Sequence, residues 1–198
     1  MRLILISASL ALAVAPVWAD SPARIDIAHL GAPCGIFALS HPRDPALALE
    51  ANISVAQCLA DQHIRTVTIV DTPAARDQLN KAVAQSIAIF DDVIARGGPT
   101  QQILAQHAKG DLLVGLTVRL RNAAPARGLA TGRELAAIEQ RHAIVEDLVR
   151  RWLAEADDCF KSAVDLARRN PGLEHDPVIA AVIDHSEHEL HPTQTAQR

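Results

Sequence analysis

The residues between Thr131 and Asn170 carry an apolar repeat that predicts one long helix. Thr131 and Glu134 have the spacing of a capping box, and Asn170, Pro171 and Gly172 end the pattern. The repeat advances by alternating steps of three and four residues through Leu135, Ile138, His142, Val145, Val149, Trp152, Ala156, Cys159, Ala163 and Leu166. Such a helix measures about 58 Å and has an apolar stripe along its length, so it must pack against other helices.

Two earlier segments also begin with helix signals. Asp44 and Thr72 are each followed directly by proline, which places a capping side chain before a residue suited to the first helical turn. Apolar residues at helical spacing then predict a helix over residues 45–70 and another from residue 73 to the stop at Gly97.

Two stretches leave a strand as the alternative. Residues 66–70 are all β-branched, and residues 112–120 alternate apolar with small or polar residues. We expect the first to end a helix and the second to belong to a helix that begins near Thr100. Asp176, also followed by proline, predicts a last short helix over residues 178–190.

Helices of this length joined by short loops are typical of an up-and-down bundle. We therefore expect an all-α fold over residues 45–190, an antiparallel helical bundle of four main helices plus a short C-terminal helix. Residues 20–44 are punctuated by proline and glycine and are expected to form an irregular N-terminal arm. Residues 191–198 would be a C-terminal tail.

The first 19 residues have the pattern of a secretory signal peptide. Arg2 precedes an apolar stretch, and small residues stand at Val17 and Ala19 ahead of the expected cleavage point. The apolar run is shorter than the ~20 residues that a spanning helix needs, and Pro16 interrupts it. We therefore expect a periplasmic or secreted protein, with no stable membrane insertion after cleavage.

Export makes the three cysteines candidates for a disulfide. If the first and last long helices are antiparallel neighbours, Cys58 and Cys159 lie at similar heights in the bundle. The expected disulfide is therefore Cys58–Cys159. The alternative is Cys34–Cys58, which would attach the N-terminal arm to the first helix.

Histidine and carboxylate side chains are concentrated near the C-terminus. In a helix, His185, His188 and His191 advance by three residues each and Glu189 follows His185 by four, so all can share one broad face. These donors suit Zn²⁺, Cu²⁺ or Ni²⁺. The candidate metal site is therefore His185, His188, Glu189 and His191. The alternative is a solvated polar face that holds no cofactor.

Other classes of function lack support in the sequence. The net charge is −4 and the aromatic content is 3%, which argues against a nucleic-acid partner. No nucleophile elbow or phosphate-binding glycine loop occurs. Glu139 and His142 have the Glu-x-x-His spacing of di-iron bundles, but no second copy exists on another expected helix.

We therefore expect an exported helical-bundle protein with a non-catalytic binding or envelope-structural role and an unknown protein or envelope partner. The apolar stripe over residues 135–166 is also compatible with a homodimer. The second hypothesis is a periplasmic protein that binds a transition metal through its C-terminal histidines and glutamate. A small enzyme is the third class considered.

Overall fold

The computed structural model describes residues 34, 44–66, 73–123, 128 and 131–190. Within these residues the chain is all-α, without strands, and its helices pack against one another. The elements are α2 (Pro45–Thr66), α3 (Pro73–Arg96), α4 (Pro99–Ala123), α5 (Gly132–Arg169), the short 3₁₀ helix η2 (Pro171–His175) and α6 (Pro177–Leu190).

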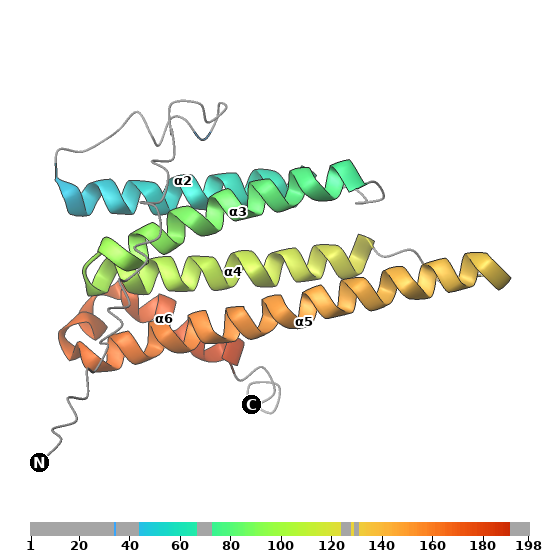
Figure 1. The fold of residues 1–198 in the computed structure, drawn as a ribbon. Coiled ribbons are helices and arrows are strands. Elements are labelled where there is room, and N and C mark those ends of the chain that lie inside the picture. The colour runs from blue at the N-terminus through green and yellow to red at the C-terminus, as the bar shows by residue number, and fades with distance from the viewer. Residues whose placement is uncertain (1–33, 35–43, 67–72, 124–127, 129–130, 191–198) are drawn as a thin grey trace, which may run out of the picture.

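The central element is α4, which packs against each of the other α-helices that the structure describes. Figure 1 shows α2 and α3 on one side of α4, and α5 and α6 on the other. Helix α2 packs against α3 and α4, whereas α5 packs against α4 and α6. The first and last long helices are therefore separated by α4 over most of their length.

This position of α4 corrects the predicted disulfide. Cys34 is bonded to Cys58, with a Cα–Cα distance of 5.6 Å, and Cys159 is a buried free thiol. The expected Cys58–Cys159 bond is wrong because α4 lies between the helices that carry these residues. The alternative pairing is the one formed. A disulfide is typical of proteins in an oxidising, extracytoplasmic environment.

Residues 112–120 are helical, so the strand alternative for them is wrong. The buried residues of α4, among them Ile103, Ala108, Leu113 and Leu116, are spread around most of the helix circumference. A helix with neighbours on several sides needs apolar residues around its circumference, so it shows no single apolar stripe. The central position of α4 thus explains its unclear sequence pattern.

Gly110 allows α4 to approach α5 closely and does not interrupt the helix. A Cβ atom placed on Gly110 would lie 2.6 Å from Cε1 of Phe160, which is too close for two carbon atoms. Phe160 is itself fully buried. The ring therefore lies against the backbone of α4 in a space that only glycine leaves open.

Helix α5 spans the residues predicted for the longest helix, but its apolar stripe is not buried throughout. Val149, Ala156, Cys159 and Ala163 are buried, whereas the stripe from residue 135 to residue 145 is only half-buried. Figure 1 shows this N-terminal part of α5 extending past the end of α4. The predicted capping box is also wrong, because the Thr131 side chain makes no capping hydrogen bond.

Lys109 is a buried cation that connects three helices. Its Nζ atom lies 2.9 Å from Asp91 Oδ1 on α3 and 2.9 Å from Glu155 Oε1 on α5. Burial by itself lowers the pKa of Lys109, but the hydrogen bonds to Glu155 and Asp91 outweigh burial, and the pKa is raised. The amine therefore remains charged and holds α3, α4 and α5 in register.

Several expectations fall outside the described residues. These are the signal peptide, the arm apart from Cys34 and Asp44, residues 67–70 of the first expected helix, and the tail that contains His191. Among the helices that are described, none has both the length and the apolar character needed to cross a membrane.

Candidate metal site between α4 and α6

Helices α4 and α6 bring His107, Asp111 and His185 together. One potential ligand atom from each residue lies within 4.8 Å of the other two. Nε2 of His107 is 3.3 Å from Oδ2 of Asp111, and Nε2 of His185 is 3.5 Å from Oδ1 of the same carboxylate. The Asp111 carboxylate therefore lies between two imidazoles, one from each helix.

Glu189 lies beside this cluster, outside the group of three whose ligand atoms all approach one another. Its Oε1 atom lies 3.8 Å from Nε2 of His185, one helical turn away on α6. His107 and Asp111 have the same i, i+4 relationship on α4. Each helix thus contributes one imidazole and one carboxylate.

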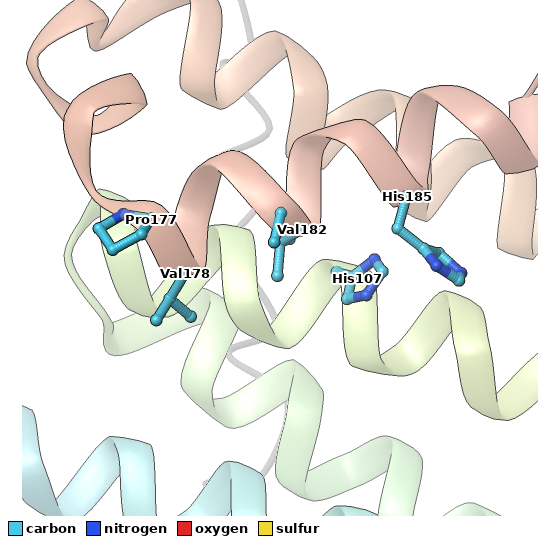
Figure 2. Close-up of a pocket in the computed structure, with 6 residues that line it drawn as sticks. His107, Pro177, Val178, Val182 and His185 are labelled. Carbon is cyan, nitrogen blue, oxygen red and sulfur yellow. The ribbon is translucent and has the colours of Figure 1, made fainter.

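Local interactions hold α6 in the position that makes this possible. Asp176 Oδ1 accepts a hydrogen bond from the backbone N–H of Val178 at 2.8 Å, which caps the start of the helix. Ile179, in the first turn of the helix, is buried in an apolar cluster with Ile103 of α4 and Ala163 of α5. The cap and this anchor direct the histidine-bearing face of α6 toward α4 (Figure 2).

Ser186 orients the His107 ring. The buried Ser186 hydroxyl donates to the Val182 carbonyl at 2.8 Å, and Oγ lies 3.0 Å from Nδ1 of His107. Because a hydroxyl has one proton, Oγ is then the acceptor for an N–H at Nδ1. With the hydroxyl proton in the bond to Val182, neutral His107 carries its own proton on Nδ1 and the lone pair of Nε2 points toward Asp111.

The environment of His107 favours its neutral form. Burial lowers the pKa of His107, and the nearby His185 also lowers it, although Asp111 and Glu189 act in the opposite direction. The ring is packed beside Phe160, with centroids 5.8 Å apart. A neutral imidazole with a fixed Nδ1–H is the form that binds a metal through Nε2.

The cluster is covered by protein on one side and open to solvent on the other. The His107 side chain is 14% exposed, whereas those of Asp111 and His185 are 44% and 51% exposed. Figure 2 shows the two histidines side by side at one end of a shallow depression that continues along Val182 and Val178 of α6. An ion from solution can therefore reach the cluster directly.

The distances from the two Asp111 oxygens to the histidines are close to those between the ligands of a small metal site. Zn²⁺ bound to nitrogen and oxygen at 2.0–2.2 Å in a tetrahedron separates its ligand atoms by roughly 3.3–3.6 Å. The contacts of Asp111 with the two histidines, at 3.3 and 3.5 Å, fall in this range, and the contact of His185 with Glu189, at 3.8 Å, lies just above it.

The structure divides the predicted metal ligands. His185 belongs to the cluster and Glu189 contacts it, but His188 is not a member and lines a groove between α5 and α6, with Lys161 and Arg168, that His185 also borders. His191 falls outside the described residues. The reason is angular, because a step of three residues rotates the helix face by about −60°, which takes His188 away from α4.

Sequence reasoning missed His107 and Asp111. Their only signal is the i, i+4 spacing of a histidine and a carboxylate inside an expected helix, which is a common pattern on helix surfaces. His142, the other histidine considered, is half-buried on α5 and does not belong to the cluster. Cys159 is no rival as a reactive group, because burial raises its pKa to about 11.

Comparison with protein-family models, with curated proteins and with solved structures finds no match to this chain. Its function must therefore be inferred from the chemistry of the residues themselves.

Proposed function

We propose that this chain is an exported, non-catalytic protein that binds one divalent transition-metal ion between α4 and α6. Nε2 of His107, the carboxylate of Asp111 and Nε2 of His185 are the ligands, with Glu189 as the fourth donor. This proposal keeps the metal-binding hypothesis suggested by the C-terminal residues but replaces His188 and His191 with two residues of α4.

The arrangement of His107 and Asp111 carries the proposal. With Nδ1–H donated to Ser186, a neutral His107 directs the Nε2 lone pair at a carboxylate oxygen 3.3 Å away. Two electron-rich atoms facing each other repel unless a cation lies between or beside them. A proton can supply that charge at low pH, but the lowered pKa of His107 disfavours protonation near neutral pH. A metal ion satisfies both groups.

The donor set indicates the class of metal. Two imidazoles with carboxylate oxygens suit Zn²⁺, Cu²⁺ and Ni²⁺, whereas Ca²⁺ and Mg²⁺ prefer oxygen ligands alone. The distances of 3.3 and 3.5 Å from Asp111 to the two histidines are compatible with the ligand spacing of Zn²⁺. We therefore take Zn²⁺ as the first ion to test.

The proposal includes the location and the finer architecture of the protein. The signal-peptide pattern of residues 1–19 and the Cys34–Cys58 bond both support export to the periplasm or beyond. We further propose that α2, α3, α4 and α5 form an antiparallel bundle to which α6 is added. The short connections between successive helices support this arrangement.

Metal analysis of the mature protein without an affinity tag tests the proposal. We expect about one equivalent of Zn²⁺ to survive dialysis, and His185→Ala to weaken binding at least tenfold in calorimetric titration. His188→Ala is the matched control, because it removes a histidine from the same helix outside the cluster. Loss of metal on dialysis, or equal effects of the two variants, would count against the proposed site.

A protein or envelope partner, including a second copy of this chain, remains a separate proposal. Its support is the N-terminal part of α5, which extends past α4 and leaves Ile144 52% exposed. Light scattering of the purified chain tests the homodimer. We expect a dimeric mass that Ile144→Asp reduces to that of a monomer, and a monomeric mass for the unchanged chain would remove this form of the proposal.

A further inference from the structure

We infer that metal occupancy controls whether α6 remains docked on α4 and α5. The bound ion acts as a clamp on the last helix, and its loss allows α6 to detach while the rest of the molecule stays folded. This inference rests on the proposed metal site and adds a conformational consequence to it.

The ligands are divided between the two elements that the clamp would join. His107 and Asp111 belong to α4, and His185 and Glu189 belong to α6. Detaching α6 therefore removes half of the donors, and only the docked state can bind the ion with full affinity. A ligand that binds one state alone shifts the equilibrium toward it by a factor of 1 + [L]/Kd.

Without an ion, few interactions hold α6 in place. Among its 14 residues only Ile179 and Ser186 are fully buried, Val182, Ile183 and Leu190 are half-buried, and Val178 is 59% exposed. The ion pair between Arg168 of α5 and Glu187 of α6 joins two exposed side chains, so it contributes little. A short helix at the edge of the fold with two fully buried residues opens at a lower free-energy cost than the helices of the core.

One of these two anchors belongs to the metal site itself. Ser186 contacts His107 across the helix interface, so the same residue helps dock α6 and orient a ligand. Ile179 is the second anchor, and it packs in an apolar cluster with Ile103, Ala163 and Ala167. Substitution of Ile179 therefore changes docking without changing the donor set.

Detachment of α6 would change the surface of the protein. Ile103, Ala163 and Ala167 are buried in the cluster that Ile179 completes. Removal of α6 would expose these side chains of α4 and α5 to water. With metal bound, α6 would cover this apolar patch. Without metal, the patch would be exposed.

Hydrogen exchange of the full mature chain, measured by mass spectrometry with and without Zn²⁺, tests the inference. At a free Zn²⁺ concentration of 100 times Kd, we expect exchange of the α6 amides to slow by about 100-fold. The amides of α2, which contribute nothing to the site, serve as the internal control and should not change. Ile179→Ala, measured without metal, should speed exchange in α6 and leave α2 unchanged.

The experiment distinguishes failure of this inference from failure of the proposed metal site. If calorimetry shows that Zn²⁺ binds but α6 exchange is unchanged, the clamp is wrong and the metal site stands. If Zn²⁺ slows exchange equally in α2 and α6, α6 does not open as a separate unit and the clamp is again wrong. If Zn²⁺ does not bind, the proposed function fails and the clamp fails with it.

Discussion

Oγ of Ser186 lies 3.0 Å from Nδ1 of His107, so a buried hydroxyl on the last helix sets the orientation of an imidazole on the central helix. Contacts to the second ring nitrogen of a ligating histidine determine its tautomer and its basicity. A residue that no metal would touch is therefore expected to control the affinity of the site.

Ser186→Ala tests this contact. The substitution removes the acceptor for the His107 Nδ1–H and leaves every proposed ligand in place. Loss of such a partner lowers metal affinity by about 10- to 100-fold in other sites, and we expect a reduction of this order for Zn²⁺ in calorimetric titration. An affinity equal to that of the unchanged chain would show that Ser186 does not orient His107.

Gly110→Ala is expected to destabilise the protein even though alanine favours helices. Alanine gains about 1 kcal/mol of helix propensity over glycine, but its Cβ would lie 2.6 Å from the Phe160 ring. Overpacking of this kind costs about 1–3 kcal/mol, so urea unfolding should show a net loss of stability. In a Phe160→Leu background the clash is reduced, and Gly110→Ala should then be less harmful or stabilising. Equal effects in both backgrounds would contradict the close contact.

Ser86→Ala is expected to stabilise the protein. The Ser86 hydroxyl is fully buried in α3 and has no hydrogen-bond partner among the described residues. An unsatisfied buried polar group costs about 1–3 kcal/mol, and alanine removes that cost at the expense of a small void. We expect the free energy of unfolding to rise by about 1 kcal/mol. A clear loss of stability would reveal a partner for this hydroxyl.

Lys109→Met should remove the part of the unfolding free energy that is lost at alkaline pH. The folded-state pKa of Lys109 is raised above its ordinary value of 10.5, so its ion pairs stabilise the fold fully below pH 10.5. That contribution is lost as the pH rises above 10.5 and through the folded-state pKa. The difference in unfolding free energy between the unchanged chain and Lys109→Met should therefore shrink at high pH. A constant difference would contradict the raised pKa.

Thiol labelling should identify Cys159 as the single free cysteine. The folded protein should resist alkylation, because Cys159 is buried and burial raises its pKa to about 11. After unfolding without reductant, mass spectrometry should find one label, located at Cys159. A label on Cys34 or Cys58 under these conditions would show that the Cys34–Cys58 bond is not formed.

Much of the helical structure could be predicted from the sequence, because it depends on neighbours along the chain. The proline-led start at Pro45 and the stop after Arg96 are local signals, and the apolar repeat indicates α5 almost to its last residue. Helix α4 was the least certain, since a central helix buried on several sides loses the one-sided pattern that marks a surface helix.

The candidate site could be predicted only in part, because its residues come from two helices that are distant in the sequence. His185 and Glu189 are one turn apart and visible as a pair, but the partners on α4 lie more than 70 residues away along the chain. The predicted Cys58–Cys159 bond failed because it assumed that α2 and α5 are neighbours. Which helix faces which is a property of the packed core.

The sequence by itself therefore determined where the helices form and which side chains could bind a metal. Only the tertiary structure decided that His107 and Asp111 meet His185, and that Cys34 is bonded to Cys58. The physical reason is the distance along the chain over which the two kinds of interaction act. Helix formation depends on hydrogen bonds and apolar spacing within a few residues, whereas contacts between helices depend on how all their surfaces fit together at once.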